Sequence, residues 1–390
     1  MSSRIGLEVS LALAEAVGVS RTDVIAAYPI TPQTHIVEHL AELVANGGLD
    51  AEYVAVESEH SAISACLGSS AAGARTFTAT ASQGLAFMHE ILFIASSMRL
   101  PLVMAVANRA LSAPINILAD HSDVMPERDI GWIQLFAENG QEVHDMTLQA
   151  FKLAEHSDVL LPVMINLDGF SLSHMIEPVT LISQEEADQF LPVCTLEPRL
   201  DPTHPRSLGS FGGADVYTEI KKQQDVALSN APKVLDGIWA DFSSQFGRSY
   251  QAVSTYKMEK AEIALVTMGA VSETARSAID QLWEEGIHAG LVRIRLWRPF
   301  PIEALRSHLG SVSKVAVLDR MLSPGSCSGP VALEVKSIFY GHTDQPQIYG
   351  YVAGLGGREL SRRTFHEIVT RSIEAKGSTE TSIFLDVREV

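Results

Sequence analysis

Three side chains with chemical potential stand where apolar segments of this chain end. Thr31, Glu59 and Arg109 each follow a short apolar run of the kind that forms a strand. A carboxylate such as Glu59 can hold or transfer a proton. A guanidinium such as Arg109 offers a planar fork that matches a carboxylate, and the Thr31 hydroxyl can donate to a carbonyl or carboxylate oxygen. Together these types favour a site that binds a small organic anion and acts on it.

Each of these residues also has a simpler explanation. Thr31, followed by Pro32, has the composition of a helix N-cap followed by proline at the first helical position. Glu59 lies at a helix start, where a carboxylate favours the helix dipole. Gly84 can relieve a tight turn, and Arg109 can be a surface charge. Taken singly, the residues leave both interpretations open.

The elements that must position these side chains form a repeated pattern. Apolar runs without in/out alternation are separated by segments of helical periodicity, which predicts a parallel sheet covered on both faces. In such a sheet the loops at the carboxyl ends of the strands hold the ligands. We therefore expect the loops that carry Thr31 and Glu59 to meet at one edge. The first half of the chain has strands predicted at 23–28, 52–56, 76–80, 102–107 and 159–166.

The pattern indicates an α/β protein with two domains. We predict a first, doubly wound domain over 1–246, a linker over 247–260 and a second α/β domain over 261–390. Within the first domain, apolar spacing predicts an opening helix over 4–18. The stretch 168–210 is irregular, and the following residues to 246 look helical.

Two further segments have ambiguous patterns. The loop 108–128 is long enough to be functional and contains Asp120-His121-Ser122-Asp123. Neighbouring residues on one loop rarely converge on one ion, so we predict no metal bound by this chain. The turn 354–358, Gly-Leu-Gly-Gly-Arg, comes at the end of its domain and does not match a dinucleotide-binding fingerprint.

Composition excludes several classes of function. The formal net charge of -18 argues against nucleic acid and anionic membranes as partners. Cys66, Cys194 and Cys327 are far apart, which excludes a disulfide framework and an iron–sulfur cluster held by this chain alone. No signal peptide and no apolar run of membrane-spanning length is present, so we expect a cytoplasmic protein.

The combination of motifs is more specific than its parts. In order and spacing, the motifs closely resemble the alpha subunit of 2-oxoacid:ferredoxin oxidoreductases, with pyruvate:ferredoxin oxidoreductases (pyruvate synthases) nearest. The resemblance covers essentially the whole chain. It rests on Tyr28-Pro29-Ile30-Thr31-Pro32, Glu57-Ser58-Glu59-His60-Ser61-Ala62, Thr80-Ala81-Ser82-Gln83-Gly84-Leu85, Pro114-Ile115-Asn116-Ile117, Asp120-His121-Ser122-Asp123, Leu318-Asp319-Arg320, Ser323-Pro324-Gly325 and Gly354-Leu355-Gly356-Gly357-Arg358.

The resemblance implies a fold and an activity. It implies a pyrimidine-binding domain of the thiamine diphosphate fold followed by a domain like the C-terminal one of transketolases. Enzymes of this family oxidise a 2-oxoacid with coenzyme A to acyl-CoA and carbon dioxide, and pass the electrons through iron–sulfur clusters to ferredoxin, a reaction typical of anaerobic metabolism.

The resemblance also implies roles for individual residues. Glu59 matches the glutamate that bonds the aminopyrimidine ring of the cofactor, and Thr31 and Arg109 match residues that hold the substrate. The neighbouring motif positions are then expected to line the cofactor or the substrate. The expected cofactor-lining residues are Pro29, Ser82, Gln83 and Gly84, and the expected substrate-loop residues are Asn108, Asp120 and Asp123.

The chain lacks motifs that a complete enzyme of this family would need, which implies that other subunits supply them. Thiamine enzymes hold the diphosphate through Mg²⁺ on a Gly-Asp-Gly loop, which this chain lacks; Asp168-Gly169 is the nearest approach, and a simple turn explains it. We therefore expect a hetero-oligomer that is active only when assembled. A beta subunit would supply the diphosphate and Mg²⁺ half of the site, and a ferredoxin-like subunit or domain would hold 4Fe–4S clusters, with a gamma-type subunit also present.

The sequence is also compatible with other substrates and with two other classes of protein. A dicarboxylate such as oxalate would need a second cation beside Arg109, and Thr31 is neutral, so a monocarboxylic 2-oxoacid is favoured, with pyruvate ahead of branched or aryl 2-oxoacids. A transketolase or 2-oxoacid dehydrogenase beta-type subunit shares the two-domain layout but needs no iron–sulfur partner. A non-catalytic scaffold, in which Glu59 only caps a helix, is the third possibility.

Overall fold

The central strand β5 (Val103–Asn108) shows how the first half of the chain folds. In this computed structural model, which describes residues 3–193, 196–343 and 345–388, the strand is fully buried. Val103 and Ala105 belong to one apolar cluster, and Met104 and Val106 to another. Successive side chains of a strand point to opposite faces, so both faces of this sheet are covered. The prediction of a covered parallel sheet is confirmed.

The first sheet is parallel except at one edge. The strand at that edge, β12, comes from the second half of the chain and pairs antiparallel with β6. Among the described residues the sheet has seven strands, in the order β12 (Leu296–Arg298), β6 (Ile133–Phe136), β7 (Val163–Asp168), β5, β4 (Thr76–Thr80), β2 (Val24–Ala27) and β3 (Glu52–Ala55).

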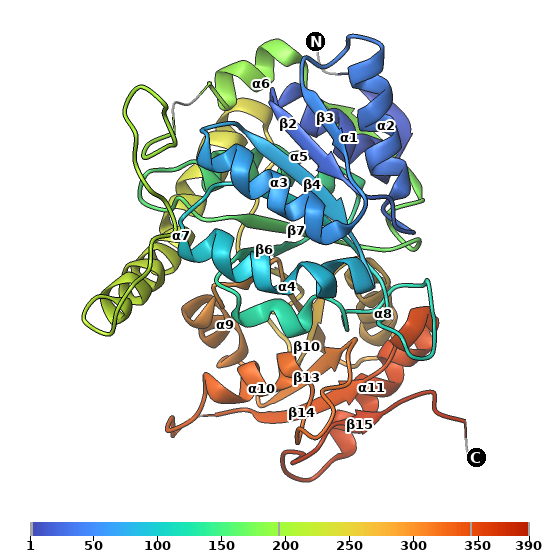
Figure 1. The fold of residues 1–390 in the computed structure, drawn as a ribbon. Helices are drawn as coiled ribbons and strands as arrows, with labels where there is room; N and C mark the ends of the chain where they lie inside the picture. Colours follow the sequence, from blue (N-terminus) through green and yellow to red (C-terminus); the bar gives the residue numbers. More distant parts are fainter. Residues whose placement is uncertain (1–2, 194–195, 344, 389–390) are drawn as a thin grey trace.

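Helices cover the two faces of this sheet unequally. Helices α1, α2, α5 and α7 contribute to the first apolar cluster. Helices α3 and α4 lie on the other face and share the second cluster with the second half of the chain (Figure 1). The bounds are α1 (Val9–Val19), α2 (Thr34–Ala45), α3 (Glu59–Ala71), α4 (Ser82–Ser97), α5 (Gly140–Ala154), α6 (Gln184–Phe190) and α7 (Tyr217–Phe246), with a 3-10 turn η1 (Met125–Asp129).

The second half forms its own sheet below the first in Figure 1. Its strands are parallel except β9, which pairs antiparallel with β11. Among the described residues the order is β15 (Ile383–Phe384), β14 (Gln347–Val352), β13 (Lys314–Asp319), β10 (Ile263–Met268), β11 (Ala289–Ile294) and β9 (Val253–Tyr256). The helices are α8 (Val271–Glu284), α9 (Ile302–Leu309), α10 (Pro330–Ser337) and α11 (Arg362–Glu374), with a 3-10 turn η2 (Leu355–Gly357).

Three segments differ in detail from the sequence-based expectation. The first part of the predicted helix 4–18 is a strand, β1 (Ser3–Glu8), paired antiparallel with β8 (Ile176–Leu181). Its partner lies far along the chain, so local periodicity could not reveal the pairing. Strand β8 and helix α6 also occupy the stretch expected to be irregular, and β9 lies inside the predicted linker 247–260. The domain boundaries 1–246 and 261–390 stay a prediction.

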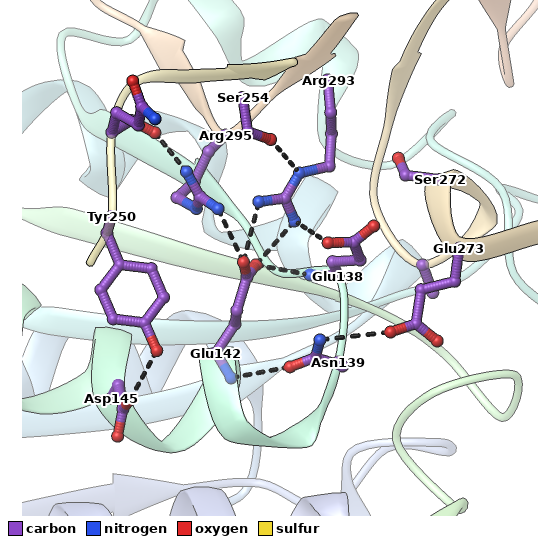
Figure 2. A network of polar contacts seen from close by, with 12 residues as sticks. Glu138, Asn139, Glu142, Asp145, Tyr250, Ser254, Ser272, Glu273, Arg293 and Arg295 are labelled. Atoms are coloured by element: carbon purple, nitrogen blue, oxygen red, sulfur yellow. Dashed lines mark hydrogen bonds and ion pairs between the residues drawn. The ribbon is translucent and has the colours of Figure 1, made fainter. Parts of the chain in front are cut away.

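A buried ion-pair cluster joins the two sheets (Figure 2). The Glu142 carboxylate, in the first turn of α5, accepts two hydrogen bonds of 2.8 Å from Arg293 and one of 2.7 Å from Arg295. Glu138 lies 2.9 Å from the same Arg293 guanidinium. Arg293 also donates to Ser254 on β9 at 3.0 Å. Because both arginines belong to the second half of the chain and Glu142 to the first, these contacts hold the two sheets together.

Among the described residues, no helix combines the length and the apolar character needed to cross a bilayer.

Candidate active site

The predicted site residues leave adjacent strands at one edge of the first sheet. Strands β5, β4, β2 and β3 are neighbours in the sheet and run parallel. Arg109 follows β5, Gly84 follows β4, Thr31 follows β2 and Glu59 follows β3. Parallel strands present their carboxyl ends at the same edge, which is where open α/β sheets bind ligands.

Glu59 is the first residue of helix α3. The helix is capped by Ser58, whose hydroxyl accepts a 3.2 Å hydrogen bond from the Ser61 NH, so the cap does not use Glu59. The Glu59 residue is only 9% exposed. Within the part of the chain that the structure describes, its carboxylate has no hydrogen-bond or ion-pair partner. Since a buried carboxylate without a partner is costly, this arrangement favours a ligand that supplies one.

Gly84 makes room for the Glu59 side chain. A Cβ atom at Gly84 would lie 2.7 Å from Cγ and 2.8 Å from Oε1 of Glu59, and 2.5 Å from Oγ1 of Thr80. Any side chain larger than hydrogen would therefore displace the carboxylate. The Thr80 hydroxyl is buried and has no hydrogen-bond partner among the described residues. The Glu59 carboxylate and the Thr80 hydroxyl, which have no partners among the described residues, therefore both border the position that a side chain at Gly84 would occupy.

Arg109 and Thr31 are brought together by their loops. The Arg109 guanidinium donates to the Thr31 carbonyl at 2.9 Å and to the Asn116 carbonyl at 2.9 Å. Arg109 is 7% exposed, and no carboxylate of the described residues pairs with it. The Thr31 residue is exposed, and its hydroxyl has no hydrogen bond to any described residue. A buried guanidinium beside a free hydroxyl can bind an anionic ligand.

The N-cap expected at Thr31 is wrong. Helix α2 begins at Thr34, and its N-cap is Gln33. The Gln33 side chain is buried and donates to the carbonyls of Tyr28 at 3.2 Å and Ala79 at 2.7 Å. These bonds fold the loop 28–33 back against β4 before the helix begins. Sequence reasoning missed Gln33, because nothing local shows that its amide will reach a neighbouring strand.

Asp123 organises the rest of this edge. Its carboxylate accepts hydrogen bonds from the backbone NH of Ser82 at 3.0 Å, the NH of Arg109 at 2.9 Å and the side-chain amide of Asn108 at 3.1 Å. Burial raises the pKa of Asp123 to about 7, although these three donors favour the ionised form. Asp123 therefore fixes the start of helix α4 and the start of the loop 108–128, and each of its carboxylate oxygens accepts at least one hydrogen bond within the chain.

The other expected cofactor-lining residues lie around this centre. Ser82 is buried, and its hydroxyl bonds the Ala110 carbonyl at 2.7 Å and the Gln83 side-chain oxygen at 2.6 Å. Gln83 is half-buried, whereas Pro29 is exposed beside Thr31. Pro29 therefore lies on the loop of Thr31, whereas Ser82 and Gln83 are the first two residues of helix α4 and directly precede Gly84.

Asp120 has a different position from Asp123. One of its carboxylate oxygens accepts from the Ser122 NH at 2.9 Å and from the Ser122 hydroxyl at 2.6 Å. The other accepts from the Gly356 NH at 3.0 Å, and Asn116 donates to the Gly356 carbonyl at 3.0 Å. The glycine-rich turn 354–358 therefore docks onto the long loop 108–128. This contact gives the ambiguous turn a structural role.

The sequence around Asp168-Gly169 predicts a simple turn, but in the structure both residues have close contacts with distant parts of the chain. Asp168 is buried and pairs with Arg320 and with His121, which lies at 3.3 Å. Burial would raise the pKa of Asp168, but the positive charge of Arg320 and the bond from His121 hold it below its usual range. A Cβ atom at Gly169 would lie 2.5 Å from the Asn108 carbonyl oxygen and 2.6 Å from Pro32. An aspartate at the end of an apolar strand is the sequence signal for this position.

Comparison with known proteins identifies the family. Residues 15–238 match the family described as pyruvate flavodoxin/ferredoxin oxidoreductase, thiamine diphosphate-binding. The chain belongs to this family. Residues 261–365 match a second family model, pyruvate:ferredoxin oxidoreductase core domain II. The resemblance inferred from the motifs is confirmed, and the chain is a subunit of an oxidoreductase.

Curated relatives of the same family match nearly the full length. The chain is 49% identical to pyruvate synthase subunit PorA of Methanocaldococcus jannaschii, over 97% of this chain and 96% of that protein. It is 46% identical to PorA of Thermotoga maritima, over 99% and 98% of the two chains. It is 43% identical to ketoisovalerate oxidoreductase subunit VorA of Pyrococcus horikoshii, over 88% and 87%.

Solved structures support the fold class. A 2-oxoglutarate:ferredoxin oxidoreductase from Magnetococcus marinus superposes with a TM-score of 0.75 at 18% identity, over 95% of this chain and 65% of that one. A split-gene transketolase superposes with a TM-score of 0.54 at 12% identity, over 94% and 97%. The predicted α/β architecture of the thiamine diphosphate type is confirmed.

Proposed function

We propose that this chain is the alpha subunit of a thiamine diphosphate-dependent pyruvate:ferredoxin oxidoreductase. The assembled enzyme would convert pyruvate and coenzyme A to acetyl-CoA and carbon dioxide and pass two electrons to ferredoxin through iron–sulfur clusters. The observation that carries the proposal is the buried Glu59 carboxylate, which has no partner among the described residues and lies against Gly84.

The residues around Glu59 fit the aminopyrimidine half of the cofactor. A hydrogen-bond acceptor and donor are free at Glu59 and Thr80, and Gly84 keeps the space beside them open. When bound, thiamine diphosphate supplies the nucleophilic carbon that adds to the 2-oxoacid and accepts the electron pair released with carbon dioxide. In our proposal Glu59 shares a proton with a nitrogen of the pyrimidine ring and so acts as the acid–base group of this chain.

Arg109 and Thr31 have the substrate role in this proposal. The Arg109 guanidinium, already held by the carbonyls of Thr31 and Asn116, would bind the carboxylate of the 2-oxoacid through its remaining N–H groups. The Thr31 hydroxyl would donate to the keto or carboxylate oxygen. Asn108 and Asp123 would position Arg109, and Asp120 would hold the loop against the turn 354–358.

We also propose that partner subunits complete the enzyme. Burial raises the pKa of the Cys66 thiol to about 12, so this residue is poorly suited to bind a cluster as a thiolate. Cys327 is exposed, and Cys194 lies outside the described residues. A beta subunit would supply Mg²⁺ and the diphosphate half of the site, and a ferredoxin-like subunit or domain would hold the 4Fe–4S clusters beside a gamma-type subunit.

Pyruvate is the proposed substrate because the site offers one cationic side chain, Arg109, and the neighbouring Thr31 is neutral. One cation suits a 2-oxoacid with a single carboxylate. The seven pyruvate synthase relatives are 41–49% identical to this chain, and the VorA relative is 43% identical. Identity therefore favours pyruvate only narrowly over branched 2-oxoacids. A substrate panel has to include both.

The experiment that tests the proposal is turnover of the purified complex with coenzyme A, a low-potential dye and several 2-oxoacids. Glu59→Ala should lower kcat by roughly a hundred- to ten-thousandfold with assembly preserved. Glu57→Ala is the matched control, because Glu57 is exposed and, among the residues that the structure describes, bonds only Ser61, at 2.5 Å. Full activity of Glu59→Ala would contradict the proposal, and a preference for a branched acid would contradict the substrate.

A further inference from the structure

We propose that Glu8, His35 and His174 form a binding site for a divalent transition metal ion, with Zn²⁺ the best chemical match. This site is separate from the proposed active-site residues, and its existence does not depend on the proposed function.

The three side chains converge on one point. Each offers one ligand atom, and these atoms all lie within 4.8 Å of one another. Nδ1 of His35 is 2.7 Å from Oε1 of Glu8. The imidazole rings of His35 and His174 have their centroids 4.5 Å apart at an interplanar angle of 35°. Small side-chain rotations would bring three ligands to bonding distance of one ion.

Different elements supply the three ligands, and the backbone already holds these elements together. Glu8 ends β1, His35 is in the first turn of α2, and His174 lies in the turn between β7 and β8. The NH of Val9 donates to the Met175 carbonyl at 3.0 Å, and the NH of Ser10 to the Ser173 carbonyl at 2.9 Å. The segments carrying Glu8 and His174 are therefore fixed next to each other before any ion binds, which lowers the cost of forming the site.

The charges around the cluster suit a cation. Among the described residues, no lysine or arginine forms an ion pair with Glu8, and its partner is His35. The side chains of His35 and Glu8 are 44% and 21% exposed, which leaves a path for the ion and for a water ligand.

An outer contact orients the second imidazole. The Ser173 hydroxyl lies 2.8 Å from Nδ1 of His174, and the Phe170 ring lies 4.5 Å from its centroid. A ligating histidine commonly bonds such a group through one nitrogen and the metal through the other. Two imidazoles and one carboxylate are the donor set of borderline metals such as Zn²⁺, whereas Ca²⁺ and Mg²⁺ prefer oxygen ligands alone.

The position of the site indicates a structural consequence. An ion there would tie the start of α2 to the turn that follows β7. Helix α2 directly follows the loop 28–33, and Gly169 at the beginning of that turn packs on Pro32. The ion would thus brace the loop that carries Thr31 without contacting it.

The chain contains a matched control on helices α1 and α2. One turn further along α2, Nε2 of His39 lies 2.8 Å from Oε1 of Glu15 on α1. This pair resembles His35 and Glu8 but is not part of any group of three convergent ligands among the described residues. His39→Ala should therefore leave metal binding unchanged, whereas loss of His35 or His174 should weaken it.

The test is calorimetric titration of the full-length chain with Zn²⁺, with Cys327→Ser in every sample to remove the exposed thiol and without affinity-tag histidines. We expect one ion per chain, and a loss of more than about a hundredfold in affinity for His35→Ala and His174→Ala. Co²⁺ added in place of Zn²⁺ should give visible absorption bands that disappear in the same variants and persist in His39→Ala.

Separate control experiments show whether the variants are folded. His174→Gln keeps the side-chain volume, and circular dichroism reports whether each variant is folded. Zn²⁺ should raise the Tm of the parent chain and of His39→Ala but not that of His174→Gln. The proposal is overturned if the parent chain does not bind Zn²⁺, if His35→Ala and His174→Gln bind it as tightly as the parent, or if His39→Ala weakens binding equally.

Discussion

Two buried regions of this molecule differ in whether their charged side chains are paired. In the cluster between the sheets, Glu142 pairs with both Arg293 and Arg295, and each group has an oppositely charged neighbour (Figure 2). At the edge of the first sheet, Glu59 and Arg109 are also buried, yet neither has an oppositely charged partner among the described residues.

This difference indicates that the paired charges stabilise the fold and that the unpaired charges bind a ligand. A buried ion pair whose charged groups are hydrogen-bonded to each other holds two elements in one geometry, and removal of one partner leaves a buried charge that destabilises the fold. A buried charge without a partner costs stability from the outset, so its presence favours a role with a ligand. The first region should therefore respond to mutation through stability, and the second through kinetics.

The largest expected effect is on stability. Glu142→Ala should lower the free energy of unfolding by about 3–5 kcal/mol, because Arg293 and Arg295 would remain buried without their shared carboxylate. Urea unfolding of the full-length chain measures this. Arg21→Gln, which breaks the exposed pair with Asp188, is the control and should change little. An equally small change for Glu142→Ala would remove the distinction between the two regions.

Arg109→Gln should act on catalysis instead. The variant loses the cation that we propose binds the substrate carboxylate, so kcat/KM for pyruvate should fall about a hundred- to a thousandfold, with most of the change in KM. Steady-state kinetics of the assembled complex measures it. Arg109→Lys keeps the positive charge but loses the planar fork of the guanidinium. Its kcat/KM should therefore lie between that of the parent enzyme and that of Arg109→Gln. Unaltered kinetics in Arg109→Gln would mean that this arginine only holds the loops together.

Thr31→Val is a smaller change at the same edge. The variant keeps the shape of the side chain and removes one hydroxyl, so kcat/KM should fall about ten- to a hundredfold through loss of a charge-assisted hydrogen bond. Thr34→Val, at the first position of α2, is the matched control. Equal kinetics for Thr31→Val and the parent enzyme would exclude Thr31 from the substrate site.

The smallest expected effect is a pH dependence that arises at Asp123. Burial raises the pKa of Asp123 to about 7, whereas an unfolded aspartate titrates near pH ~4. The folded state thus retains this proton to higher pH, and its contribution to stability should fall as the pH rises from about 4 to about 7.

Asp123→Asn does not titrate and should lack this part of the slope. Between pH ~6 and ~8, the free energy of unfolding measured in urea should fall by about 1–2 kcal/mol more for the parent chain than for Asp123→Asn. Asp319, whose pKa burial also raises to about 7, is present in both proteins and cancels. Identical slopes would show that Asp123 is already ionised in the folded chain at the lower pH.

Much of the active-site edge could be predicted from the sequence. Glu59, Gly84, Thr31 and Arg109 each follow a strand of one parallel sheet, and that topology alone places them at one edge. What could not be predicted is how each side chain is used. Thr31 was expected to cap a helix, yet Gln33 is the cap and folds the loop onto β4. Its amide bonds a carbonyl 46 residues away, a contact without a local signature.

The sequence by itself determined the α/β class, the family and the set of residues at the strand ends, because apolar periodicity and motif order are local properties of the chain. Tertiary structure alone decided that β1 is a strand, that Asp168 pairs with Arg320 and that Glu8, His35 and His174 converge. These features join residues distant in sequence. These contacts form only when the elements pack against one another, so the local amino-acid composition does not predict them.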